Sequence, residues 1–371
     1  METIVKPKIV LIGPCGGGGI PKNGASAKNY HLSKFLQDRG VYLKIIDTEK
    51  WRKNPIILFD LFFTILFNPK AKFIVATDNM SGYRTMKAFS LFPRKRHVIY
   101  WIIGGSIANW IKEGKVDANA YKIVNTFIVE GVKMQKTFAE CGFHNTIYVP
   151  NFKYVGSMPK KLQKRDKFVK FVFLSRIIPQ KGCRMILNAV KQLNATHGML
   201  FSVDFYGPID DSYKNEFTTD VATLFNVNYK GFLDLRITTN YNELSKYDIM
   251  LFPTYWDGEG FPGIAIDSFI AGLPVIATDW SLNSDIIDKG ITGIVLPVRL
   301  RDGINSSLLA SGEIPFDENE VTRELIISMK YFIENPSCIN LMSKSCQIKA
   351  RDYDINNVLT IELFQQLGIN L

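Results

Sequence analysis

The sequence contains few of the residues that build metal sites and disulfides. Its 371 residues include only five cysteines and four histidines. The cysteines are scattered, odd in number and without Cys-x-x-Cys spacing, and no His or Cys cluster has the spacing of metal ligands. This pattern argues against a disulfide framework and a structural zinc site, and it favours a reducing compartment, the cytoplasm.

Long apolar runs and phosphate-binding motifs are also missing. No segment contains a run of about 18 apolar residues, the length that a transmembrane helix needs. The first residues, METIVKPKIVLIG, have lysines inside a short apolar run and no cleavage site, so they predict a first strand and not a signal peptide. The Gly-rich segment that follows, GPCGGGGIPKNGAS, has neither a G-x-G-x-x-G register nor the lysine of a P-loop.

Acidic residues are scarce in the first half of the chain. Residues 1–167 contain 28 Lys and Arg against 11 Asp and Glu, or +17, whereas residues 168–371 contain 17 against 24, or −7. The basic half is therefore expected to meet an anionic partner. Nucleic acid is not expected, because the basic residues are spread between apolar strands and no nucleic-acid motif is visible. A membrane surface and a diphosphate-linked substrate fit equally well.

What the chain does have is a regular alternation of short apolar runs and amphipathic segments. In the first half, strands are predicted at residues 8–12, 43–47, 73–76, 97–102, 127–129 and 147–149. A second alternation begins at residue 171. Such alternation predicts the α/β class with doubly wound parallel sheets, and the length predicts two domains. The expected boundaries are 1–165 and 166–350, followed by a C-terminal helix at 351–371 that packs back on the first domain.

Residues 248–279 form the clearest single pattern. An apolar strand ends at Pro253, the loop TYWDGEGFPG follows, and an apolar helix leads to Gly272 and a second strand, which together predict a βαβ unit. The helix carries one strongly polar residue, Asp267, and a carboxylate in such surroundings needs a partner. One partner is a ligand at the helix N-terminus, where glycines permit close approach. The other reading is that Asp267 caps a neighbouring backbone and Glu259 is a solvated loop residue.

The run EGFPGIAIDSFIAGLPVIATD resembles the donor-site signature of glycosyltransferase family 4, retaining enzymes of the GT-B fold. Its two acidic residues, separated by seven others, are Glu259 and Asp267, and the second is Asp where the family usually has Glu. The resemblance implies two Rossmann-like domains that face a cleft, with Asp267 bonded to the nucleotide ribose. It also implies that the donor sugar and its phosphate are held by Glu259, Gly260, Phe261, Pro262 and Gly263.

The segment FVFLSRIIPQKG resembles the G-R-x-x-x-x-K-G element of the same family, with Ser175 in place of the first Gly. Arg176 and Lys181 flank the loop after a predicted strand, where a guanidinium fork and an ammonium suit a diphosphate. Arg-x4-Lys alone is common on surfaces, but here it stands about 80 residues before the acidic signature, as in the family. The catalytic residues implied are Arg176, Lys181 and Glu259. The stretch YKGFLD resembles a nucleoside-pocket element and implies that Phe232 and Leu233 lie near the base.

In the resembling family the Gly-rich loop after the first strand faces the cleft, so Gly17 and Gly18 are implied to approach acceptor and donor phosphate. The alternative is a mobile surface loop. No metal and no cofactor are expected: the only Asp-x-Asp, Asp352 and Asp354, lies in a helical tail. The two cationic side chains and the helix dipole would do the work of a divalent ion.

The segment 56–67, IILFDLFFTILF, is apolar except for Asp60 and Thr64, which fall on one helical face four residues apart. It predicts a helix packed on the sheet, although its Phe and Leu content with Arg52 and Lys53 before it also permits an interfacial helix. With Arg94, Lys95 and Arg96 further on, this half is expected to dock on an anionic membrane face.

The sequence thus predicts a glycosyltransferase that moves a sugar from a nucleotide diphosphate-sugar to a saccharide or lipid-linked acceptor, in cell-surface polysaccharide synthesis. Two other readings stay open. A sugar-nucleotide epimerase or phosphorylase of related fold would act without an acceptor, and a catalytically silent protein would only bind sugar nucleotide or membrane. A soluble acceptor in a basic cleft is the alternative to membrane docking.

Overall fold

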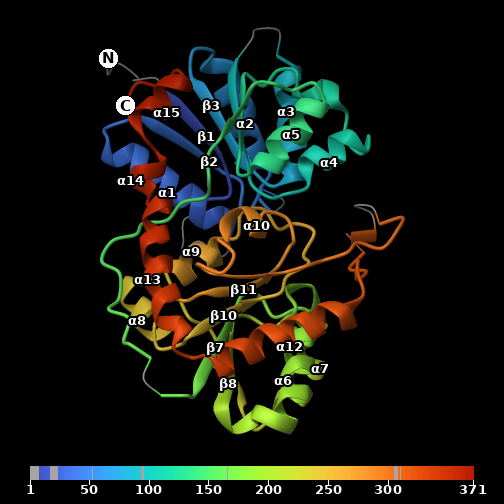
Figure 1. The fold of residues 1–371 in the computed structure, drawn as a ribbon. Helices are drawn as coiled ribbons and strands as arrows, with labels where there is room; N and C mark the ends of the chain where they lie inside the picture. The colour runs from blue at the N-terminus through green and yellow to red at the C-terminus, as the bar shows by residue number, and fades with distance from the viewer. Residues whose placement is uncertain are drawn as a thin grey trace. The chain divides into compact units, whose positions relative to one another are not determined.

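The computed structural model describes residues 8–16, 24–51, 53–92, 96–164, 166–304, 308–309 and 311–371. It divides into two compact units. The first comprises Met1–Tyr154 with Ile355–Leu371, and the second comprises Val155–Asp354. Each unit is built on one sheet with helices around it (Figure 1).

The first unit contains a six-stranded parallel sheet in the order β2-β1-β3-β4-β5-β6. Its strands are β1 (Ile9–Gly13), β2 (Leu43–Asp47), β3 (Lys72–Thr77), β4 (His97–Ile102), β5 (Thr126–Val129) and β6 (Thr146–Tyr148). Each predicted strand is confirmed to within one residue at either end. The central strands are buried on both faces, which explains why they read as continuous apolar runs in the sequence.

Helices cover this sheet and return to it at the end of the chain. They are α1 (Gly24–Asp38), α2 (Ile56–Phe67), α3 (Asn79–Ser90), α4 (Ile107–Lys112), the 3-10 turn η1 (Ala118–Tyr121), α5 (Val132–Glu140), α14 (Ile355–Val358) and α15 (Ile361–Gln366). The ring of Phe364 in α15 stacks on that of Phe35 in α1, with centroids 5.9 Å apart. The last residues of the chain thus pack on the helix that follows the first strand.

The second unit contains another six-stranded parallel sheet, in the order β12-β11-β10-β7-β8-β9. Its strands are β7 (Val169–Leu174), β8 (Phe201–Tyr206), β9 (Val227–Tyr229), β10 (Ile249–Phe252), β11 (Val275–Thr278) and β12 (Gly293–Leu296). Its longer helices are α6 (Cys183–His197), α7 (Lys214–Ala222), α9 (Gly263–Ile270), α12 (Glu318–Glu334) and α13 (Cys338–Ala350). Its shorter elements are η2 (Pro179–Lys181), η3 (Gly198–Leu200), η4 (Thr238–Asn240), α8 (Tyr241–Leu244), α10 (Asn283–Ile286) and η5 (Arg351–Tyr353).

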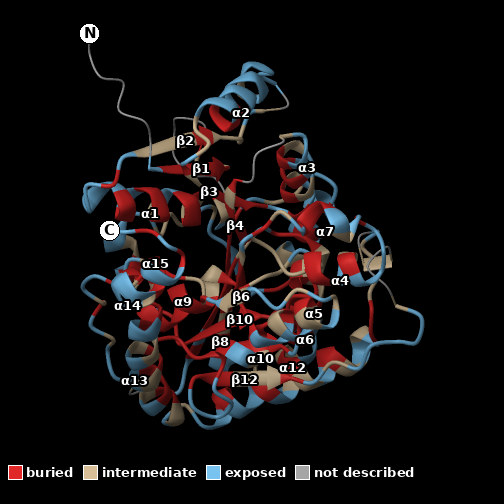
Figure 2. Ribbon diagram, turned by 90° about the horizontal axis from the view of Figure 1, so that it is seen from above, coloured by how far each residue is buried: buried red, intermediate tan, exposed pale blue. Residues whose placement is uncertain are grey.

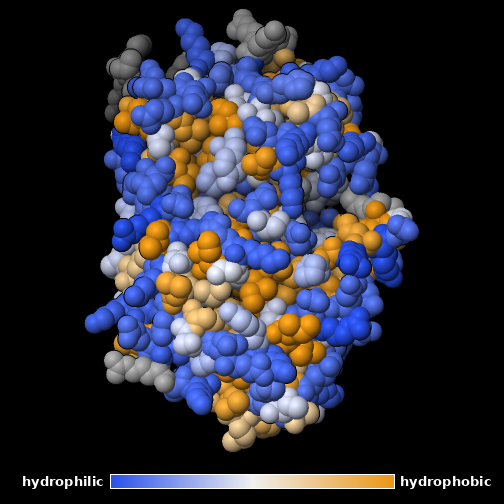
Figure 3. Space-filling model, in the orientation of Figure 1, coloured by the Kyte–Doolittle hydropathy of each residue, from blue (hydrophilic) through white to orange (hydrophobic). Residues whose placement is uncertain are grey.

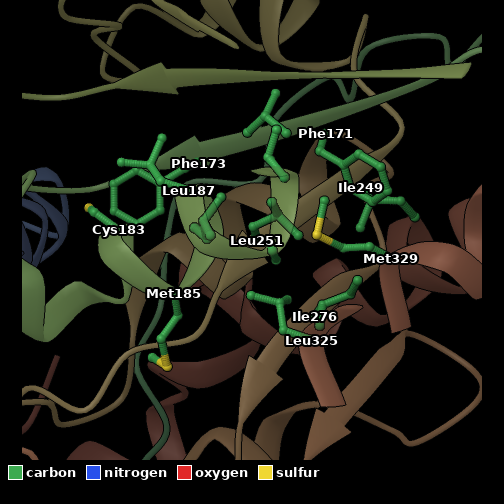
Figure 4. Packing of buried hydrophobic residues seen from close by; sticks show 14 of the residues in the cluster. Phe171, Phe173, Cys183, Met185, Leu187, Ile249, Leu251, Ile276, Leu325 and Met329 are labelled. Carbon is green, nitrogen blue, oxygen red and sulfur yellow. The ribbon is translucent and has the colours of Figure 1, made fainter. Parts of the chain in front are cut away.

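Alternate residues of the central strands fill two separate cores. Phe171, Ile249 and Ile276 point to one face, where they join α6 and α12 (Figure 4). Their chain neighbours Val172 and Met250 point to the other face and join a cluster that includes α9 and α13. Because side chains alternate along a strand, an uninterrupted apolar run is what a sheet covered on both faces requires. The prediction of doubly wound parallel sheets is confirmed.

Candidate functional site

Arg176, Lys181 and Glu259 lie on loops that leave two neighbouring strands of the second sheet, and the loop of the next strand emerges beside them. In the order β11-β10-β7, residues 279–282 follow the first strand, residues 253–262 follow the second and residues 175–182 follow the third. These strands are parallel, so all three loops emerge at the carboxyl edge, where ligands bind in sheets of this kind. The topology thus gathers segments about 100 residues apart at one edge.

The loops after β7 and β10 are locked together through their backbones. Gly182 has φ 84°, and a Cβ there would collide with the carbonyl of Pro253, so only glycine permits this approach. Next to it, the Tyr255 N–H donates to the Gln180 carbonyl at 2.8 Å. The loop that carries Lys181 is therefore held against the loop that carries Glu259.

Lys181 and Glu259 form a salt bridge between these two loops. Their side chains are only 9% and 11% exposed, so Glu259 is not a solvated loop residue. The Thr254 hydroxyl donates to the same carboxylate at 3.1 Å, which fixes its orientation. A charged pair with so little solvent costs free energy to bury unless it is well bonded.

Arg176 lies on the same loop as Lys181 but stays exposed. Its guanidinium carbon is 4.8 Å from the ring centroid of Trp256, a cation–π contact that orients the side chain. Trp256 is itself held, because its carbonyl accepts the indole N–H of Trp280 at 2.9 Å. The guanidinium can thus present its donors to solvent beside the buried Lys181–Glu259 pair.

The third loop contributes a residue in a strained conformation. Ser281 has φ 53°, the left-handed region that side chains other than glycine seldom adopt, and its hydroxyl donates to the Glu259 carbonyl at 2.7 Å. Sequence reasoning missed Ser281, Trp256 and Thr254 as parts of this site. Only Thr254 and Trp256 left a signal, because both lie in the loop TYWDGEGFPG between the strand and the signature.

Asp267 lies on α9, one turn after the helix N-terminus, and is buried. Its carboxylate accepts a hydrogen bond of 2.5 Å from the Tyr241 hydroxyl of α8. Burial, together with the charge of Asp267, raises the pKa of Tyr241 well above its usual range, so the phenol stays a donor. Sequence reasoning required a partner for Asp267 but missed this one, which stands 26 residues earlier in the chain.

The remaining predicted residues are spread more widely. Phe232 is exposed and Leu233 is half-buried against the core of the second unit, both on the segment after β9. Phe261 is buried, and its ring packs against Tyr353 with centroids 5.3 Å apart, so this side chain belongs to the core. Gly260 and Gly263 are half-buried beside Pro262, which ends the loop at α9. Gly17 and Gly18 lie outside the described residues.

Within the described ranges, no group of three or more His, Cys, Asp or Glu side chains is placed to hold a metal ion. Two cationic side chains, Arg176 and Lys181, lie instead on the loop after β7 at this edge. Together with the N-terminus of α9, whose cap residue Pro262 makes no side-chain cap bond, they suit an anionic group such as a diphosphate.

Comparison with known proteins identifies a domain in this region. Residues 169–309 match the family model described as glycosyl transferases group 1. All three loops of the site lie inside the matched segment. The match supports a glycosyltransferase. A protein of Klebsiella pneumoniae, described as an uncharacterized 41.2 kDa protein in the cps region, is 27% identical over 128 residues, which are 34% of this chain and 32% of that protein.

Solved structures resemble the chain over nearly its whole length. Anabaena Alr3699/HepE in complex with UDP has a TM-score of 0.65 at 14% identity, covering 97% of this chain and 98% of that chain. The lipopolysaccharide outer core galactosyltransferase WaaB has a TM-score of 0.66 at 11% identity, covering 97% of this chain and 98% of that chain. Sucrose-phosphate synthase from Thermosynechococcus elongatus has a TM-score of 0.70 at 14% identity, covering 98% of this chain and 99% of that chain. At these identities the likeness shows the fold alone: two Rossmann-like domains of the GT-B type.

Proposed function

We propose that this chain is a retaining hexosyltransferase that moves a sugar from a nucleotide diphosphate-sugar to an acceptor. The observation that carries the proposal is the cluster of Arg176, Lys181 and Glu259 at one sheet edge, inside a glycosyl transferase group 1 domain. Retention of configuration rests on the family resemblance of the signature around Glu259 and Asp267.

The chemistry asked of the protein is mainly electrostatic. Negative charge builds on the diphosphate as it leaves the sugar, so cations aimed at it stabilise the transition state more than the ground state. Arg176 offers a bidentate fork to that group. Lys181 has three N–H donors, so its salt bridge with Glu259 leaves donors for a phosphate oxygen. Glu259, held by Thr254 and Lys181, contacts the donor sugar in this proposal.

The nucleoside half of the donor is assigned to Asp267 and the segment after β9. Asp267 takes the ribose hydroxyls with the carboxylate that Tyr241 already orients, while Phe232 and Leu233 pack near the base. UDP-sugars are the first donors to test, because structural neighbours of this chain include complexes with UDP and UDP-glucose.

The acceptor is assigned to an N-terminal domain, residues 1–165, and the donor to a C-terminal domain, residues 166–350. A saccharide or lipid-linked acceptor in cell-surface polysaccharide synthesis agrees with the cps-region relative from Klebsiella. The net charge of +17 on residues 1–167 supports an anionic membrane surface as a further partner, on the cytoplasmic face. The described residues contain no helix long and apolar enough to cross a membrane.

The test is an assay of donor turnover with and without acceptor. Purified protein is incubated with a UDP-sugar and a panel of saccharide and polyprenyl-diphosphate-linked acceptors, and both UDP release and glycosylated product are measured. Transfer that requires an acceptor supports the proposal. Conversion of the sugar nucleotide without any acceptor would indicate an epimerase or phosphorylase, and tight binding without turnover would indicate a silent binder.

A further inference from the structure

Helix α2 exposes an apolar face that is larger than the face it buries. Within the described chain, seven of its large apolar side chains are 41–69% exposed: Ile56, Leu58, Phe59, Phe62, Phe63, Leu66 and Phe67. At about 100° per residue these positions span roughly half of the helix circumference. Only Leu61, Thr64 and Ile65 are buried, Ile57 is half-buried, and Figure 2 shows most of the helix exposed at the edge of its unit.

Single exposed apolar residues are ordinary on proteins, and the face shown in Figure 3 carries small groups of them among polar side chains. The face of α2 differs because its members lie together on one side of a single helix and several are aromatic. The rings of Phe63 and Phe67 stack with their centroids 5.9 Å apart, and the ring centroids of Phe62 and Phe92 are 5.3 Å apart. Continuous apolar surface of this kind marks a site of interaction.

The helix is anchored to its unit, so its exposed face is presented in a fixed orientation. The guanidinium Nε of Arg96 donates to the carbonyl of Ile65 at 3.1 Å, and both groups are buried. Leu61 and Ile65 belong to the core of the first unit. The exposed rings are therefore held outward by the fold.

The charges around α2 favour an anionic occupant. Asp60 is the one acidic residue of the helix, and Lys44 pairs with it at 2.6 Å. Lys53 before the helix and Lys70 after it are exposed. Residues 44–96, from the strand before α2 to Arg96, contain eleven Lys and Arg against four Asp and Glu, a net charge of +7.

A second copy of the chain fits this surface less well. A symmetric dimer places the same patch against itself, so the basic residues that border α2 in both copies would be brought together. An anionic surface neutralises those residues while it covers the apolar face. The helix is about 18 Å long, too short to cross a hydrocarbon core of about 30 Å, so it must lie along such a surface.

We propose that α2 lies in the headgroup region of an anionic lipid bilayer, with its phenylalanine face inserted and its flanking lysines on the lipid phosphates. This is the arrangement typical of interfacial helices. The inference names the element by which the proposed enzyme meets its membrane partner, and to that extent it rests on the proposed function. The binding itself does not depend on any activity.

The test is sedimentation of the full-length protein with phosphatidylcholine vesicles of rising phosphatidylglycerol content, at low and at physiological salt. We expect binding that rises with phosphatidylglycerol. The double variant Phe59→Ser with Phe63→Ser should lower the partition coefficient about tenfold or more, because it removes two exposed rings that leave water when the helix inserts. The matched control is Leu341→Ser with Ile348→Ser, two apolar residues on α13 that are more exposed than Phe59 and Phe63, and this variant should bind like the wild type. Lys53→Ser with Lys70→Ser should weaken binding at low salt more than at high salt.

Three further results would overturn the proposal. The first is no pelleting at any composition, and the second is equal binding by the α2 variant and its control. The third is a wild-type dimer in solution that the α2 variant converts to a monomer, since that would assign the face to a second copy. UDP binding, measured by calorimetry on the same variants, separates this inference from the proposed function. Loss of vesicle binding with UDP affinity intact bears only on the role of α2. Absence of UDP affinity in the wild type bears only on the proposed enzymatic function.

Discussion

In the described part of each unit, a lysine–glutamate pair is buried near the carboxyl ends of the strands, and the surroundings of the two pairs differ. Lys28 of α1 pairs with Glu130 after β5, with side chains 4% and 3% exposed. The Lys28 ammonium lies 5.2 Å from the Trp101 ring and 5.5 Å from that of Phe152. Burial lowers the pKa of Lys28, although Glu130 acts in the opposite direction.

The pair in the second unit, Lys181 with Glu259, has a different neighbourhood. The strained Ser281 donates to the backbone carbonyl of Glu259, and the Glu259 loop also carries Trp256, on which the exposed guanidinium of Arg176 lies, and leads into α9. The same two residue types thus serve different purposes. An ion pair enclosed by aromatic rings contributes to the fold, whereas an ion pair on loops that also carry an exposed cation and lead into a helix N-terminus is placed to meet a ligand. The comparison makes the following predictions, from the largest effect to the smallest.

Replacing Lys28 by Met should cost about 3–5 kcal/mol of unfolding free energy, because Glu130 then loses its buried counter-charge. Urea denaturation measures this loss. The double change Lys28→Met with Glu130→Leu should recover most of it, since an apolar pair of similar volume needs no counter-charge. A single variant as stable as the wild type would show that the enclosed pair is not structural.

Arg176→Ala and Lys181→Ala should each slow sugar transfer at least about tenfold while the fold survives, because each removes a charge-assisted contact with the leaving diphosphate. Initial rates and melting temperatures are measured together. Arg184→Ala is the control: this arginine stands on α6, pairs with Glu216 on the surface and should leave the rate unchanged. Wild-type rates in both loop variants would refute the diphosphate assignment.

Asp267→Asn should weaken nucleotide binding several-fold, whereas Asp267→Glu should keep or improve it, because the ribose hydroxyls need a carboxylate acceptor. Calorimetric titration with UDP measures both. Tyr241→Phe removes the hydrogen bond to Asp267 without removing the charge. If all three variants lower the melting temperature and none changes affinity selectively, Asp267 is only a structural partner of Tyr241.

Chelation of divalent metal ions should have no effect on sugar transfer. If Arg176, Lys181 and the α9 amides neutralise the diphosphate, EDTA leaves the transfer rate unchanged. Activity that EDTA abolishes and Mn²⁺ or Mg²⁺ restores would show that a metal ion does part of this work.

Much of the fold could be predicted from the sequence because buried parallel strands leave a strong signal. Runs such as residues 97–102 and 249–252 are apolar at every position facing either core, and the predicted bounds 97–102 match those of β4. The loop positions of Arg176, Lys181 and Glu259 followed from the predicted ends of the strands that precede them. Their contact with one another depends on strand order, which places β7 beside β10 and which no local pattern encodes.

Other features depend on packing between distant segments. Tyr241 reaches Asp267 only because α8 packs on α9, and the left-handed backbone of Ser281 has no marker in a residue type that seldom adopts it. Helix α2 was predicted either to pack on the sheet or to lie at an interface. Because it is apolar almost all round, periodicity alone did not decide between them, and the structure shows three residues buried and seven large apolar residues exposed.

The central claim, that a nucleotide diphosphate-sugar binds beside Arg176 and Lys181, is tested most directly by thermal shift. UDP-, GDP-, ADP- and CMP-sugars are screened against the wild type and against Arg176→Ala with Lys181→Ala. A ligand at 100 times its dissociation constant adds about 2.7 kcal/mol to stability. The account predicts that one nucleotide class stabilises the wild type by an amount of this order and the double variant far less. Equal stabilisation of both proteins, or no stabilisation of the wild type by any of the four, would contradict it.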